Sequence, residues 1–207
     1  MIAAASPYET WVRTLRAWQT DCTVPLDDLP VLTVADLPPA AWDRFVTHLA
    51  GCLRASMDQW EQSFVTSLRR ETDEFRRANV MVDARRALAR RLLLGRHPGL
   101  PEPLRQAAWD SIARDIRSLQ DQLEQMARQG SGTLDPRRVN RDVAFYTAQS
   151  LTVLLTPGFP LEEFASGRYA PAAPPAPAPA TAPVTQSSAV LPPGLGSSRP
   201  RTIRPLS

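Results

Sequence analysis

The sequence predicts an all-α protein: an elongated antiparallel helical bundle or coiled-coil hairpin, followed by a disordered C-terminal tail rich in proline and alanine. Three observations predict this class. Apolar residues recur at intervals of three and four along successive segments. These segments begin and end at residues typical of helix caps and turns. Ten of the 21 prolines fall among the last 38 residues, so we expect a helical body over residues 1–169 and a separate tail over residues 170–207.

The first helix is predicted over residues 7–20. Ser6 and Glu9 have the spacing of a capping box, and Pro7 suits the first helical position between them. The apolar stripe of this helix consists of Tyr8, Trp11, Leu15 and Trp18. Residues 21–39 then form an extended connection that contains four prolines. Its apolar residues, which we expect to lie along a groove between helices, are Leu29, Val31, Val34 and Leu37.

A long second helix is predicted over residues 40–94. This range contains no proline, and its only glycine is Gly51. A continuous helix of this length would extend for about 80 Å, as helices do in coiled coils and long bundles. The phase of the apolar repeat shifts by about one residue after Phe75, so we expect a break near residue 79.

The third helix, predicted over residues 103–129, carries the most regular repeat in the chain. Six apolar residues, spaced alternately by three and four, form a heptad seam: Trp109, Ile112, Ile116, Leu119, Leu123 and Met126. We expect this seam to pair with the long second helix and to join copies of the chain into a homo-oligomer. A fourth helix is predicted over residues 136–155, with Asp135 as its cap and Pro136 at its first position.

Charge is divided unevenly between the body and the tail. The body has 21 arginines and 21 acidic residues, and the tail has three arginines and no acid. A neutral body argues against a protein that coats nucleic acid. One basic patch nevertheless has five arginines and no acid: Arg85, Arg86, Arg90, Arg91 and Arg96. This patch either contacts the phosphates of a nucleic acid or is neutralised by the five aspartates of residues 17–43.

No set of residues predicts catalysis, a cofactor site or a metal site. Glycine-rich phosphate loops, nucleophile elbows and zinc-protease helices are not found in the sequence. His48 and Cys52 share a helical face, but neither a third ligand nor an orienting carboxylate accompanies them. Two cysteines, Cys22 and Cys52, are too few for a disulfide framework. The uncharged run over residues 143–161 is too polar to span a membrane, so we expect a soluble, cytoplasmic protein.

The end of the tail has the composition of a docking peptide. An uncharged spacer of alanine and proline leads to three arginines, which are donors for acidic groups, and to two apolar anchors: Arg199, Arg201, Arg204, Ile203 and Leu206. The sequence therefore predicts a non-enzymatic scaffold or adaptor that self-associates through its body and docks a protein partner through its tail. The alternative is a nucleic-acid-associated protein that uses the basic patch and the tail arginines.

Overall fold

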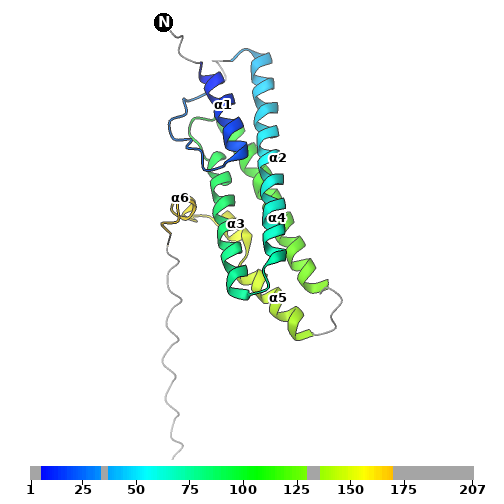
Figure 1. The fold of residues 1–207 in the computed structure, drawn as a ribbon. Helices are drawn as coiled ribbons and strands as arrows, with labels where there is room; N and C mark the ends of the chain where they lie inside the picture. The colour runs from blue at the N-terminus through cyan, green and yellow to red at the C-terminus, as the bar shows by residue number, and fades with distance from the viewer. Residues whose placement is uncertain (1–5, 34–36, 130–135, 170–207) are drawn as a thin grey trace, which may run out of the picture. The chain divides into compact units, whose positions relative to one another are not determined.

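The computed structural model describes residues 6–33, 37–129 and 136–169, and these residues form helices and no strands (Figure 1). The elements in chain order are α1 (Pro7–Thr20), α2 (Pro39–Arg70), α3 (Glu74–Leu94), α4 (Glu102–Gln129), α5 (Pro136–Ala148), the 3-10 helix η2 (Leu151–Leu155) and α6 (Leu161–Ala165). The all-α class is therefore confirmed for the described residues, and the tail over residues 170–207 lies outside them. Within the described ranges, no helix combines the length and the apolar character needed to cross a membrane.

Helix α1 begins at the predicted capping box. The backbone N–H of Glu9 donates to the Ser6 hydroxyl (3.2 Å), and the Glu9 carboxylate accepts from the Ser6 N–H (3.1 Å). These two bonds satisfy donors that a helix N-terminus leaves free. The buried face of α1 consists of Trp11, Leu15 and Trp18, and it packs against α2.

The connection after α1 is held against the turn between α3 and α4. The indole Nε1 of Trp11 donates to the carbonyl of Pro30 (2.7 Å), and the N–H of Leu32 donates to the carbonyl of Gly99 (2.8 Å). In this arrangement the Leu32 side chain is buried (2% exposed), whereas Val31 is 63% exposed. The expectation that Val31 lies in a groove is therefore wrong, because the bond from Leu32 to Gly99 fixes which side chain faces the core. Val34, predicted to lie in the same groove, is outside the described residues.

The long second segment is two helices, and its break comes at residues 71–73 rather than near residue 79. Helix α2 ends at Arg70, and Asp73 caps α3 by accepting the Arg76 N–H at 2.9 Å. Helix α3 is continuous through residue 79, where the break was predicted. Phe75, the residue where the repeat loses phase, is 75% exposed on the first turn of the new helix. The phase shift therefore follows from the start of a helix with its own buried face.

The heptad seam of α4 is largely buried inside the single chain. Ile112, Ile116, Leu119 and Leu123 are buried among the core residues, together with Met81, Leu88 and Leu92 of α3. Helix α4 contacts both α2 and α3, which lie beside it in Figure 1. Packing within the chain thus explains the regularity of this repeat.

The fourth predicted helix ends at Ala148, seven residues earlier than expected. Gln120 of α4 is buried, and its side chain holds the chain at this point: its Nε2 donates to the Tyr146 carbonyl (3.3 Å), and its Oε1 accepts the Leu151 N–H (2.9 Å). The Ser150 hydroxyl then accepts the Thr152 N–H and starts η2. A residue of another helix therefore ends α5.

Candidate functional site

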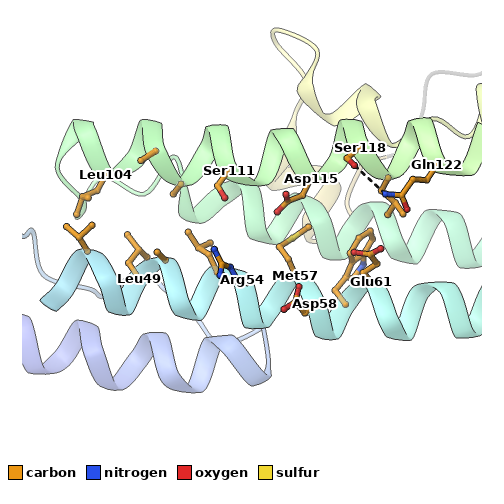
Figure 2. A pocket seen from close by; sticks show the side chains of 17 residues that line it. Leu49, Arg54, Met57, Asp58, Glu61, Leu104, Ser111, Asp115, Ser118 and Gln122 are labelled. Carbon is orange, nitrogen blue, oxygen red and sulfur yellow. Dashed lines mark hydrogen bonds between the residues drawn. The ribbon is translucent and has the colours of Figure 1, made fainter. Parts of the chain in front are cut away.

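A groove of about 310 Å³ lies between α2 and α4 and is the best-formed candidate site (Figure 2). Its walls come from residues 46–61 of α2 and residues 104–122 of α4. The two helices run in the same direction here, since Leu49 lies near Leu104 at one end and Glu61 lies near Gln122 at the other. The groove therefore follows several turns of both helices and is elongated along them.

The floor of the groove is apolar. On α2 it is formed by buried side chains that recur at intervals of four and three: Leu49, Leu53, Met57 and Trp60. On α4 it is formed by Leu104, Ala108 and Leu119, which are four and eleven residues apart and so lie on one side of that helix. This is the helical spacing of one face. The same stripes that form the core thus continue up to the groove.

The groove is open because α4 presents small or polar side chains along its middle. Ala107, Ala108 and Ser111 occupy positions where larger apolar residues would fill the space against α2. Figure 2 shows Ser111 and Asp115 pointing toward α2, above Arg54 and Met57. Side-chain volume, rather than a missing helix, therefore creates this hollow.

The charges along the groove are mostly negative. Asp58 and Glu61 of α2 and Asp115 of α4 line it, and Arg54 is the single basic residue among its lining residues. Desolvation raises the pKa of Asp115; the negative charge of Asp58 raises it further, while Arg114 and Arg54 lower it. A carboxylate from each helix thus faces the same space, and the charge of Asp58 opposes the ionisation of Asp115.

This arrangement is suited to binding. The lining contains no histidine or cysteine, and its hydroxyls belong to Ser111 and Ser118. The Ser118 hydroxyl accepts a hydrogen bond from the amide of Gln122 at 3.4 Å. Across the described residues, no group of three or more His, Cys, Asp or Glu side chains could hold a metal ion. An apolar floor with carboxylates above it has the chemistry that suits a cationic, amphipathic ligand.

The predicted oligomer seam does not form a free surface. Ile112, Ile116, Leu119 and Leu123 are covered by the chain itself, Trp109 is half-buried, and Met126 is 51% exposed. The prediction that these six residues together join two chains is therefore wrong. The reason is that α2 and α3 cover the seam within one copy.

Two of the five arginines of the basic patch are engaged within the body. Arg91 is 6% exposed and donates to the carbonyls of Ala87 (2.9 Å) and Ser56 (3.0 Å). Arg85 is half-buried and donates to the side chain of Gln149 at 2.7 Å. Arg91 cannot reach a phosphate backbone from this position, so its assignment as a nucleic-acid contact is wrong.

The other three arginines of the patch are more exposed than Arg91. Arg86 lies 3.5 Å from Asp83 in an exposed ion pair. The guanidinium of Arg96 lies over the ring of Trp109, 4.5 Å from its centroid, a cation–π contact. Arg90 is half-buried and, together with Arg96, lines a pocket other than the α2–α4 groove. Among the described residues, no ion pair joins the basic patch to the aspartates of residues 17–43.

The pair of His48 and Cys52 does not form an activated nucleophile. The Cys52 sulfur lies 3.6 Å from His48 Nε2, which also lies 3.3 Å from the carbonyl of Val12. Cys52 is 2% exposed, and burial raises the pKa of its thiol. A raised pKa disfavours the thiolate.

Two features of the body were not predicted from the sequence. The first is the groove, whose signal is the run of small residues Ala107, Ala108 and Ser111 on an otherwise apolar face. The second is the role of His97: its Nε2 donates to the Leu26 carbonyl (2.8 Å), and its Nδ1 accepts the Gly99 N–H (3.0 Å). No local pattern reveals the second role, because Leu26 is far from His97 in sequence.

Comparisons of the chain with known protein families, with curated proteins and with solved structures found no match. The function is therefore proposed from the geometry of the body. The tail residues predicted to bind a partner (Arg199, Arg201, Ile203, Arg204 and Leu206) lie outside the described residues.

Proposed function

We propose that this protein is a non-enzymatic helical adaptor, and that the α2–α4 groove receives a helix of a partner protein. The observation that carries the proposal is an open groove whose floor is apolar and whose walls hold three carboxylates and one guanidinium. Adaptors bind helices in this way, with apolar anchors in a groove and charges along its edges.

The shape of the groove favours a helical segment over a compact small molecule. Its α2 wall covers residues 46–61, which corresponds to about 24 Å at 1.5 Å per residue. A partner helix lying along this wall would place apolar residues at positions i, i+3, i+4 and i+7 above Leu53 and Met57. A small molecule would occupy a fraction of that length.

The charge of the groove specifies a basic partner. Asp58 and Asp115 lie on opposite walls, and the charge of Asp58 disfavours the charge on Asp115. An arginine of the partner placed between them would relieve this repulsion and could donate hydrogen bonds to both carboxylates. An acidic partner would add to the repulsion. The occupant we propose is therefore an amphipathic helix with an apolar stripe flanked by arginine or lysine.

Other features of this adaptor follow from the sequence and are part of the same proposal. Helices that follow one another in the chain form antiparallel pairs of coiled-coil type, the body self-associates, and the tail docks a second protein. A homo-oligomer would have to use a face other than the seam, since four of the six seam residues are covered. We place the protein in the cytoplasm, because Cys22 and Cys52 are both free.

Nucleic-acid association is the second candidate. It rests on the remaining arginines of the basic patch and on those of the tail, and the burial of Arg91 counts against it. Its distinguishing property would be a steep loss of affinity with salt. Binding to the groove should respond to the charge of a peptide instead.

A labelled model peptide tests the adaptor proposal. The peptide has about 18 residues, enough to follow the groove, with leucines at i, i+3, i+4 and i+7 and arginines beside them. Its twin carries glutamates in place of the arginines. In fluorescence anisotropy with the full chain, we expect the arginine peptide to bind at least about tenfold more tightly than the twin.

Variants of the chain locate the binding surface. Asp58→Asn combined with Asp115→Asn should weaken the arginine peptide by about tenfold. The matched control is Asp121→Asn, which removes an exposed carboxylate of α4 that does not line the groove, and it should leave binding within about twofold. Equal binding of the two peptides, or equal losses in the two sets of variants, would contradict the proposal.

A further inference from the structure

Arg91 is a buried cation that forms no ion pair with a carboxylate of the described residues. Its side chain donates to two backbone carbonyls, its Nε has no hydrogen-bond partner, and no ion pair joins it to an acid within the described part of the chain. Burial lowers the pKa of this guanidinium. A buried charge is costly unless an opposite charge accompanies it. The surroundings of Arg91 thus favour an anion beside it.

The ionisable group that touches Arg91 is the thiol of Cys22. The Nη1 of Arg91 donates to the Cys22 sulfur at 3.3 Å. A sulfur in this position gains a charge-assisted hydrogen bond when it is a thiolate. The thiolate is also the form of cysteine that reacts. Arg91 is therefore placed to donate a hydrogen bond to the Cys22 sulfur while that sulfur reacts.

Cys22 also faces a pocket that a reagent can enter. The residue is half-buried and lines a pocket of about 640 Å³, between the connection that follows α1, the end of α3 and α6. Charged residues of both signs line this pocket: Arg90, Arg96, Arg168, Asp27 and Glu162. Neighbouring positive and negative side chains suit a zwitterionic ligand built from amino acids.

We propose that Cys22 is a site of reversible S-thiolation by low-molecular-weight disulfides of cysteine-derived thiols. The Cys22 thiolate attacks one sulfur of the disulfide, a new Sγ–S bond forms, and the S–S bond of the reagent breaks. The second half of the reagent leaves as a thiolate and takes a proton from water. Cys22 is oxidised in this step, and the released thiol is the reduced product. Attack by a free thiol reverses the exchange.

Cys52 provides the comparison within the same molecule. It is 2% exposed, burial raises the pKa of its thiol, and its sulfur lies near His48 rather than an arginine. Neither access nor a neighbouring guanidinium favours its reaction. We infer that a disulfide reagent modifies Cys22 and leaves Cys52 unmodified.

Oxidised glutathione is the probe for this proposal. The full chain is incubated with it at neutral pH, and mass spectrometry of the digested protein gives the rate at each cysteine. We expect at least about a hundredfold preference for Cys22, with recovery of the free thiol on addition of dithiothreitol. A synthetic peptide of residues 18–26 serves as the unfolded reference, and Cys22 in the folded chain should react about tenfold faster than in this peptide.

Two arginine variants separate activation from access. Arg91→Met keeps an apolar stem without the charge and should slow Cys22 by about tenfold. The control is Arg86→Gln, which removes a charge of the same helix α3 that does not line the pocket, and it should change the rate by less than about twofold. Circular dichroism checks that each variant is folded, and the comparison with the peptide needs no variant. A rate in the folded chain no higher than in the peptide, or equal rates in the two variants, would overturn the proposal.

Discussion

Helix α2 is closed on the side that faces α1 and open on the side that faces α4. Toward α1, the buried rings of Phe45 and Trp11 meet edge to face, with their centroids 6.3 Å apart. Toward α4, the groove of about 310 Å³ remains beside Leu53 and Met57. Both faces of α2 carry apolar residues at helical spacing, so the difference comes from the helices opposite. Helix α1 supplies tryptophans, and α4 supplies alanine and serine.

This contrast shows what an apolar stripe does and does not specify. A stripe indicates that a helix face will be covered. The volume of the opposing side chains decides whether the chain covers that face completely. The α1 side is therefore expected to carry stability, and the α4 side is expected to tolerate change.

Truncating a side chain on each face should give the largest difference. Trp11→Ala removes a fully buried ring and its hydrogen bond to Pro30, so we expect a loss of about 3–5 kcal/mol in the free energy of unfolding. Met57→Ala enlarges a space that is already open, and we expect a loss of about 2 kcal/mol. Urea denaturation followed by circular dichroism measures both. Equal losses would show that the two faces are equally well packed.

Adding a methyl group at two glycines should give effects of opposite sign. A Cβ at Gly99 would lie 2.9 Å from Trp11 Cζ2 and 2.9 Å from His97 Cε1, so Gly99→Ala should cost about 1–3 kcal/mol. A Cβ at Gly51 would meet no atom within 4 Å. Because Gly51 is inside α2, Gly51→Ala should stabilise the protein by about 0.5–1 kcal/mol. Thermal melts of the two variants check the pair, and a stabilising Gly99→Ala would contradict the close packing of this turn.

His97 should make the closed side sensitive to acid. Burial lowers the pKa of His97, an effect opposed by its bond to the Leu26 carbonyl and by the charge of Asp27. The folded state therefore binds fewer protons than the unfolded state, whose histidine titrates near 6.5. Stability should be fully present above that pH and should fall as the pH drops below it toward the lowered pKa. His97→Gln should remove this part of the pH dependence, as measured by melting temperatures between pH 7 and pH 5. An unchanged slope in the variant would exclude His97 as its source.

The smallest effect is expected on the open side, at Asp115. Desolvation raises the pKa of this carboxyl, so the folded state binds more protons here than the unfolded state does. The free energy of unfolding should therefore decrease as the pH rises from 3.8, the ordinary pKa of an aspartate, through the raised pKa of Asp115. Asp115→Asn should match the natural chain at low pH and become slightly more stable than it at neutral pH. A variant that is less stable at neutral pH would show that Asp115 has a favourable partner.

Features set by neighbouring residues in the chain were predictable from the sequence. The capping box of Ser6 and Glu9 was predicted and is confirmed. It was predictable because all of its atoms come from four consecutive residues. The break between α2 and α3 was predicted near residue 79 but lies at residues 71–73. These residues include neither proline nor glycine, and the break depends on the cap at Asp73. An aspartate followed by a helical repeat was its available signal.

Features that depend on distant residues were not predictable. The end of α5 depends on Gln120, which lies on another helix. The buried position of Leu32 depends on the carbonyl of Gly99. The groove exists because Ser111 and Asp115 face α2, and periodicity does not say which helices lie opposite each other. Local sequence patterns thus predict the helices of this fold, whereas the candidate site depends on how those helices pack together.

Hydrogen–deuterium exchange of the full chain, with and without saturating arginine peptide, tests the central claim most directly. If a basic helix binds the α2–α4 groove, peptides covering residues 46–61 and 104–122 should exchange more slowly in its presence, because those ranges line the groove. Residues 7–20, none of which lines the groove, should be unchanged. Protection confined to residues 74–94, or protection nowhere in the body, would contradict the assignment of the groove as the docking surface.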